Sequence, residues 1–368
     1  MQTNLKSMAA GLALAALVAA TPALAAELKI GVLVPTTGGQ ATYGQDMANA
    51  VQLAMDELNK AGGADTYSAV VGDDGCDPQQ AVNAATKLVS SGIVAVIGGY
   101  CSGATIPTLK IFGDAKLPFV ITAANSTKLI PANPGNAFMI NSTGNDQVAK
   151  AMDVWKAKGY KALAIVNEGD AYSQDLATLA QKNFPTNGGT VVDFETVNHG
   201  EQDYSAVVTK IKAANADAVF WTAYDDDGGP FIKQLRGGGY AGDIYVGDGS
   251  TSANLFKLAG DAAEGVYAFS SPTAEFLPGA KAFADAYKAK FNIDPSSYGP
   301  LTYDGMKLLG SAIAAAGGTD SAKLIDALQK SDYKDGIAGE ISFRDDHTLA
   351  RSNFVVVVGK GGTWALAN

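Results

Sequence analysis

The sequence predicts an α/β protein built as two lobes, each around a mostly parallel sheet. Short apolar runs of strand length alternate with segments in which apolar residues recur every three or four positions, a pattern typical of βαβ units. The alternation runs through two successive series, which meet near residues 141–145. The chain of 368 residues also exceeds the roughly 250–300 residues at which a single hydrophobic core stops growing. Two lobes are therefore expected.

The first series begins with a buried strand at 30–34, followed by a helix whose apolar face runs from Met47 to Leu58. Asp77-Pro78 is expected to open a second helix, because aspartate is a good helix cap and proline suits the first helical turn. The remaining elements expected in this series are strands at 69–71, 93–97 and 118–121 and a helix at 106–112.

The second series has the same order of elements. It predicts strands at 162–166, 191–194, 218–222 and 244–246, and helices at 148–155, 173–182, 204–213 and 230–236. The C-terminal part differs, with helices expected at 281–291, 301–316 and 322–328, then strands at 341–343 and 354–358 that return across a hinge. Because no Gly/Ser-rich or Pro-rich linker separates the series, we expect several short crossings between the lobes.

The N-terminus indicates export. Lys6 is the only charged residue before Glu27, and an apolar run extends from Met8 to Ala20. Ala23-Leu24-Ala25 then matches the small-x-small pattern of a signal peptidase site, so cleavage is expected near Ala25 or Ala26. The alternative is an uncleaved membrane anchor, but the run is shorter than the ~20 residues that a span needs. The periplasm is therefore the predicted location.

Composition excludes several classes of function. With 27 Lys and Arg against 37 Asp and Glu, the net charge is −10, which does not suit nucleic acid or anionic lipid. The two cysteines, Cys76 and Cys101, are expected to form a disulfide in an oxidising compartment. The two histidines, His199 and His347, have no partner at metal-ligand spacing, so no metal site is predicted.

The loops after the strands are where a ligand is expected, because ligands of parallel sheets bind outside the carboxyl ends of the strands. In the first series these loops are 36–44, 98–103 and 122–126, which are rich in glycine and hydroxyl residues that suit an anion. In the second they are 168–172, 224–229 and 247–249, which add tyrosines and carboxylates. Together they would suit a zwitterion, with its carboxylate on the first lobe and its ammonium on the second. The alternative is that these residues only form turns and caps.

Two motifs resemble the leucine/isoleucine/valine-binding protein family: Asp73-Asp74-Gly75-Cys76-Asp77-Pro78 and Gly98-Gly99-Tyr100-Cys101-Ser102. The resemblance extends over essentially all of the chain after the signal peptide. It implies a type I periplasmic-binding fold, in which two Rossmann-like lobes are joined by three hinge crossings. The expected division is a signal peptide at 1–26, an N-terminal lobe at 27–144 and 272–350, and a C-terminal lobe at 145–271 and 351–368.

The resemblance also implies a function. A monomeric protein of this family would bind a free amino acid, branched-chain or related and small, without a cofactor, and deliver it to the permease and ATPase subunits of an ABC transporter. The alternative is a receptor domain that senses amino acids, amides or related small molecules. An enzyme is not expected, because the sequence lacks P-loop, dinucleotide-binding and nucleophile-elbow motifs and a paired His–carboxylate site.

The ligand contacts implied by the resemblance come from both lobes. Ser102 and Ser126, with the backbone of Ser102 and Ala124, would bind the ligand carboxylate. Asp248 would bind the ammonium group. The pocket walls would be Tyr43, Tyr172 and Tyr224.

Three features depart from the family pattern. Asn125 stands beside Ser126, and either residue could take the place of the usual hydroxyl. Asn141 occupies a crossing where relatives often carry arginine. The acidic run 225–227 is interpreted as a solvated turn, the alternative being that it favours a ligand with a second positive group.

Overall fold

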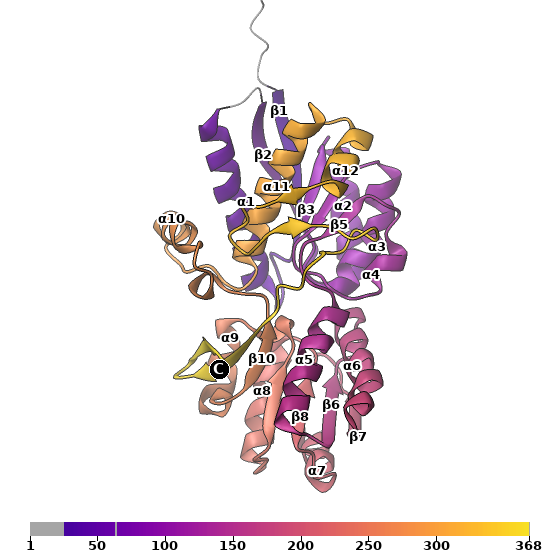
Figure 1. Cartoon of the computed structure of the whole chain (residues 1–368), viewed down its shortest axis with the longest axis vertical. Helices are drawn as coiled ribbons and strands as arrows, with labels where there is room; N and C mark the ends of the chain where they lie inside the picture. The colour runs from indigo at the N-terminus through magenta and orange to yellow at the C-terminus, as the bar shows by residue number, and fades with distance from the viewer. Residues whose placement is uncertain (1–25, 63–64, 368) are drawn as a thin grey trace, which may run out of the picture.

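The computed structural model describes residues 26–62 and 65–367, and it contains two large sheets that form the upper and lower lobes of Figure 1. The predicted α/β class with mostly parallel sheets is confirmed. The predicted signal peptide lies outside the described residues, apart from Ala26, which begins the first strand. Within the described ranges, no helix is both long and apolar enough to cross a membrane.

The upper sheet has five parallel strands in the order β2-β1-β3-β4-β5. Its strands are β1 (Ala26–Val34), β2 (Asp65–Asp73), β3 (Ala95–Gly98), β4 (Phe119–Ile121) and β5 (Ala137–Met139). The helices of this lobe are α1 (Ala41–Ala61), α2 (Pro78–Ser90), α3 (Ser102–Asp114), α4 (Leu129–Ala132), α10 (Lys281–Phe291), α11 (Gly299–Ala316) and α12 (Ser321–Gln329). Asp77 caps α2 as predicted, accepting a 2.7 Å hydrogen bond from the backbone of Gln80.

The lower sheet has seven strands in the order β14-β13-β10-β9-β8-β6-β7. Its parallel strands are β6 (Ala162–Asn167), β7 (Thr190–Thr196), β8 (Ala218–Trp221), β9 (Asp243–Val246) and β10 (Tyr267–Ser270), and the antiparallel ones are β13 (Val355–Lys360) and β14 (Thr363–Leu366). Its helices are α5 (Gly144–Lys158), α6 (Ala171–Asn183), α7 (Ser205–Ala213), α8 (Asp225–Gly237) and α9 (Ala253–Ala259), with short 3-10 turns η1 (Phe184–Asn187), η2 (Asp248–Ser250) and η3 (Gly260–Ala263). A fourth short turn, η4 (Ala274–Phe276), follows the second crossing, and its Ala274 packs with α1 and α10 of the upper lobe.

The strand predicted at 341–343 does not join either large sheet. β12 (Ile341–Ser342) instead pairs with β11 (Asp332–Tyr333) in a separate two-stranded sheet. The strand predicted at 354–358 does cross to the lower sheet, where β13 pairs with β10. Strands β5, β10, β11 and β14 were not predicted. Each has at most four residues, and runs of this length carry little periodic signal.

The chain crosses between the sheets three times: from β5 to α5, from β10 to α10 and from β12 to β13. Hydrogen bonds join the crossings to one another. Ser271 Oγ donates to Asn141 Oδ1 over 2.8 Å, and Ser142 Oγ donates to Asn353 Oδ1 over 2.6 Å. The three segments therefore lie side by side, as the expected hinge requires.

The predicted disulfide is present in the upper lobe. Cys76 and Cys101 are bonded, with their Cα atoms 5.3 Å apart. The bond ties the loop before α2 to the residue that precedes α3. Since Ser102 is the first residue of α3, the disulfide also holds one edge of the predicted ligand site.

A pH dependence of stability is expected from two buried carboxyl groups of the upper lobe. Burial raises the pKa of Asp74 and of Asp304 to about 7, although backbone N–H groups donate to both. Between about pH 4 and pH 7 the folded protein keeps protons that the unfolded chain has released, so the free energy of unfolding should fall as pH rises and level off above pH 7.

Asp304→Asn should flatten this fall by up to about 3 kcal/mol between pH 5 and pH 7. Urea denaturation at pH 5, 7 and 8 measures the slope. Asp153→Asn is the control, because Asp153 is exposed on α5 and its variant should keep the slope of the parent protein. An identical slope in Asp304→Asn would contradict the prediction.

Candidate ligand-binding site

The predicted strand-end loops of the two lobes meet around a small cavity of about 10 Å³, which is room for roughly one water molecule. Its lining comes from both sheets. The residues are Tyr100, Ala123, Asn125, Tyr172, Tyr224, Asp248, Gly249 and Tyr298. The described lining is thus made of phenol rings, one amide, one carboxylate and two small residues, with no basic side chain.

Asp248 lies at the centre of the hydrogen bonds in this cavity. It follows β9, begins η2 and is 1% exposed. Its Oδ1 accepts a hydrogen bond from the Tyr172 hydroxyl over 2.8 Å. Its Oδ2 accepts from the Tyr298 hydroxyl (2.8 Å) and from the amides of Asn125 (2.8 Å) and Asn141 (3.2 Å). Burial raises the pKa of Asp248, and these four donors oppose that rise.

Asp248 therefore connects both lobes and a crossing. Tyr172 belongs to the lower lobe, Asn125 to the upper lobe, and Asn141 to the first crossing, where its amide also donates to the Ala123 carbonyl over 2.6 Å. All four partners of the carboxylate are neutral. A cationic group of a ligand would be the first full charge to compensate it.

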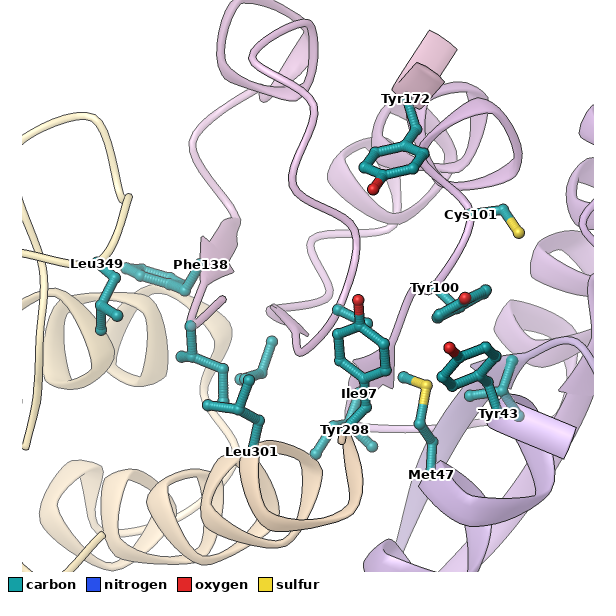
Figure 2. Packing of buried hydrophobic residues seen from close by; sticks show 14 of the residues in the cluster. Tyr43, Met47, Ile97, Tyr100, Cys101, Phe138, Tyr172, Tyr298, Leu301 and Leu349 are labelled. Atoms are coloured by element: carbon teal, nitrogen blue, oxygen red, sulfur yellow. The ribbon is translucent and has the colours of Figure 1, made fainter. Parts of the chain in front are cut away.

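Tyrosine rings form the walls of the cavity. Tyr100 stacks on Tyr43 with 4.8 Å between ring centroids and meets Tyr298 edge-on at 5.4 Å. On the opposite side of the cavity, the ring centroids of Tyr172 and Tyr224 are 5.2 Å apart. In Figure 2 the hydroxyls of Tyr172 and Tyr298 face each other across the gap, whereas Tyr43 lies beside Tyr100 and Met47, on the core side. Tyr43 thus supports the wall from behind and is not part of the lining.

The proposed carboxylate side is arranged differently from the expectation. Ser102 is 1% exposed, and its Oγ accepts the Ser126 N–H over 3.2 Å. The Ser126 hydroxyl donates to Asp175 Oδ2 (3.0 Å) and so points to α6 of the lower lobe. The N–H of Ala124 is bonded to the Gly99 carbonyl over 2.8 Å. Of the two alternatives left open by the sequence, it is Asn125 that lines the cavity.

The interpretation of residues 225–227 as a solvated turn is wrong. They form the first turn of α8, and Asp225 and Asp227 are 3% and 4% exposed. Asp225 accepts hydrogen bonds from the hydroxyl of Ser252 and from the amide of Gln40 in the upper lobe (3.4 Å for the latter). Asp225 is buried because the N-terminus of α8, where carboxylates are favourable, faces Gln40 of the opposite lobe. Asp227 is instead covered within its own lobe by His199 and Gly200.

The site residues that the sequence did not name as ligand contacts are Tyr100, Ala123, Asn141, Gly249 and Tyr298, although Tyr100, Ala123 and Gly249 lie in predicted ligand loops. Tyr100 lies inside one of the two motifs that resemble the leucine/isoleucine/valine-binding proteins, so its position in the sequence could have indicated a place in the site. Tyr298 is the N-terminal flank of α11, in the segment that follows the second crossing. It follows no strand of either large sheet, which is why strand-end reasoning could not find it.

The comparisons with known proteins agree with this architecture. The profile of the family described as "Periplasmic binding protein" matches residues 27–363. The fold and the interlobe site define a two-lobed solute-binding protein. The chain belongs to this periplasmic binding protein family.

Its similar proteins carry names from the predicted group. The chain is 30% identical over 346 residues to "Leu/Ile/Val-binding protein homolog 2" of Brucella abortus (strain 2308), with 92% of each chain covered. It is 29% identical over 335 residues to the "Leucine-, isoleucine-, valine-, threonine-, and alanine-binding protein" of Pseudomonas aeruginosa, with 89% of each covered.

A solved structure confirms the type I periplasmic-binding fold. The branched-chain amino acid transporter substrate-binding protein LivJ from Streptococcus pneumoniae, in complex with isoleucine, superimposes with a TM-score of 0.85 at 28% identity. The match covers 93% of this chain and 99% of that one.

Proposed function

We propose that this protein is the solute-binding component of an ABC importer and that it binds a free amino acid between its lobes. The observation that carries the proposal is Asp248, a buried carboxylate at the lobe interface whose partners in the described structure are all neutral. Such a group suits the α-ammonium of an amino acid. The names of the similar proteins, which refer to branched-chain amino acids, support the same class of ligand.

The two ends of the ligand would bind to different lobes. The ammonium group would bind Asp248, in exchange for the amide of Asn125. The carboxylate would lie toward Ser102, whose side chain stands at the N-terminus of α3, where partial positive charge favours an anion. The side chain of the ligand would pack against Tyr100 and Tyr224. No step of this binding changes the ligand chemically.

A thermal-shift screen over free amino acids tests the proposed function. Ligand at 100 times its Kd stabilises the folded state by about 2.7 kcal/mol, so a true ligand should raise the melting temperature, and calorimetry should then give one site per chain. The recovered amino acid should be unchanged. If no free amino acid raises the melting temperature, the proposed function is wrong.

Delivery of the ligand requires the lobes to open. We propose lobes at 27–144 with 272–350 and at 145–271 with 351–368, export by the N-terminal segment, and monomeric docking on a permease with its ATPase. Polar contacts join the lobes in the described structure: Thr127 N–H donates to Asp175 over 2.6 Å, for example. Bonds of this kind exchange readily with water.

The radius of gyration should therefore decrease when the ligand binds, because the ligand stabilises the closed form. Small-angle X-ray scattering with and without saturating amino acid measures this change. A radius that stays constant at saturation would show rigidly docked lobes and would contradict the hinge.

A further inference from the structure

Three loops that follow neighbouring strands of the lower sheet meet beside the interlobe cleft. Glu168 follows β6, His199 follows β7, and Asp227 lies in the first turn of α8, which follows β8. Strands β8, β6 and β7 are adjacent in that order and parallel. Their carboxyl ends therefore bring together three potential metal ligands that are far apart in the sequence.

The geometry of the three side chains fits a metal ion. His199 Nδ1 lies 2.8 Å from Asp227 Oδ2 and 3.6 Å from Glu168 Oε2, and one atom from each residue lies within 4.8 Å of the others. Ligand atoms around a tetrahedral zinc ion at ~2.1 Å are about 3.4 Å apart. Small side-chain adjustments would thus place one nitrogen and two oxygens around such an ion.

Glu168 provides a second observation that favours cation binding at this cluster. Its side chain is only 3% exposed, and its Oε1 has no hydrogen-bond partner within the described residues. The other oxygen of the same carboxyl group faces His199. A buried carboxylate oxygen without a partner is unfavourable, and a coordinated cation would satisfy it.

The surroundings of the cluster resemble an outer coordination shell. Asp226 Oδ2 lies 3.9 Å from His199 Nε2, and the Gly200 N–H donates to Asp227 Oδ2 over 2.7 Å. Histidines that bind metals commonly contact a carboxylate through their other ring nitrogen, and ligating carboxylates are themselves hydrogen-bonded. Three carboxylates thus surround one imidazole, and in the described ranges none of them forms a salt bridge with a lysine or arginine.

We propose that Glu168, His199 and Asp227 form a binding site for a divalent transition-metal ion of the zinc type. The imidazole nitrogen favours such an ion over Mg²⁺ or Ca²⁺, which prefer oxygen ligands alone. The site lies on the rim of the cleft. Asp226, the residue before Asp227, lies so close to Gly39 of the upper lobe that a Cβ atom added to Gly39 would clash with it. It is separate from the amino-acid cavity and does not depend on the proposed function.

Calorimetric titration of zinc chloride into the tag-free, chelator-treated protein tests the site. One equivalent of zinc should bind, and Mg²⁺ should not replace it. His199→Gln should weaken zinc binding by about 100-fold or more, because it removes the only nitrogen ligand. The variant should fold normally, since the His199 side chain is 66% exposed. Glu168→Gln should weaken binding as well.

His347→Asn is the matched control, because His347 lies in the upper lobe, where its ring stacks on Phe138, and asparagine tolerates its positive φ of 65°. This variant should bind zinc like the parent protein. Co²⁺ absorption in the visible range gives a second measurement, which should show a tetrahedral spectrum that disappears in His199→Gln. Failure of the parent protein to bind zinc, or equal binding by His199→Gln, would overturn the proposal and leave the cluster as an ion pair of His199 with its carboxylates.

Discussion

Replacing Asp248 with asparagine is expected to weaken amino-acid binding by about two to four orders of magnitude. Asp248 is the one charged side chain in the described lining of the cavity. Without it, the ammonium group of the ligand would be desolvated without a charged partner, which costs about 3–5 kcal/mol, and each 1.4 kcal/mol is about tenfold in affinity. The NH₂ group of the introduced asparagine would also point its hydrogens at the hydroxyl and amide groups that now donate hydrogen bonds to the Asp248 carboxylate. Calorimetry with the best ligand of the screen measures the loss.

Two further aspartate variants make the result specific. Asp153→Asn changes an exposed carboxylate in the same lobe and should bind like the parent protein. Asp225→Asn tests another buried carboxylate near the cleft. Normal binding by Asp248→Asn together with a loss in Asp225→Asn would place the ammonium site on the acidic run and contradict our assignment.

Gly249→Val is expected to reduce binding below detection, a loss of at least about 100-fold. A Cβ atom at this position would lie 2.9 Å from Tyr172 Cε1 and 3.1 Å from Tyr224 Cδ1. Both rings line a cavity of about 10 Å³, so the valine side chain would occupy the space between the tyrosines. Since packed interiors do not accommodate extra methyl groups without displacement, ligand and valine should exclude each other. Calorimetry measures the loss, and circular dichroism checks the fold.

Gly237→Val is the matched glycine control. A Cβ atom added to Gly237, the last residue of α8, has no neighbouring atom within 4 Å. This variant should keep the affinity of the parent protein. Full-affinity binding by Gly249→Val would show that the ligand lies elsewhere in the cleft and would contradict the cavity assignment.

The local periodicity of the sequence determined most of the fold. Strands such as β1 and β6 and helices such as α5 appear where apolar spacing predicts them, and α2 begins where its capping residue predicts, because both signals arise within a few neighbouring residues. The strand-end loops also led to Asp248 and Tyr172, since the topology of parallel sheets collects such loops at one edge. The two motifs that resemble the leucine/isoleucine/valine-binding proteins led to the family to which the chain belongs.

Only the tertiary structure decided which polar groups are buried and which residues meet. Asp225 belongs to a run of like charges that, taken alone, favours exposure, but the upper lobe covers it with Gln40. Tyr298 enters the cavity from the segment after the second crossing, and His199 meets Glu168 and Asp227 through the order of three strands. These contacts join residues distant in sequence, and burial is set by what packs against a segment, which spacing along the chain does not record.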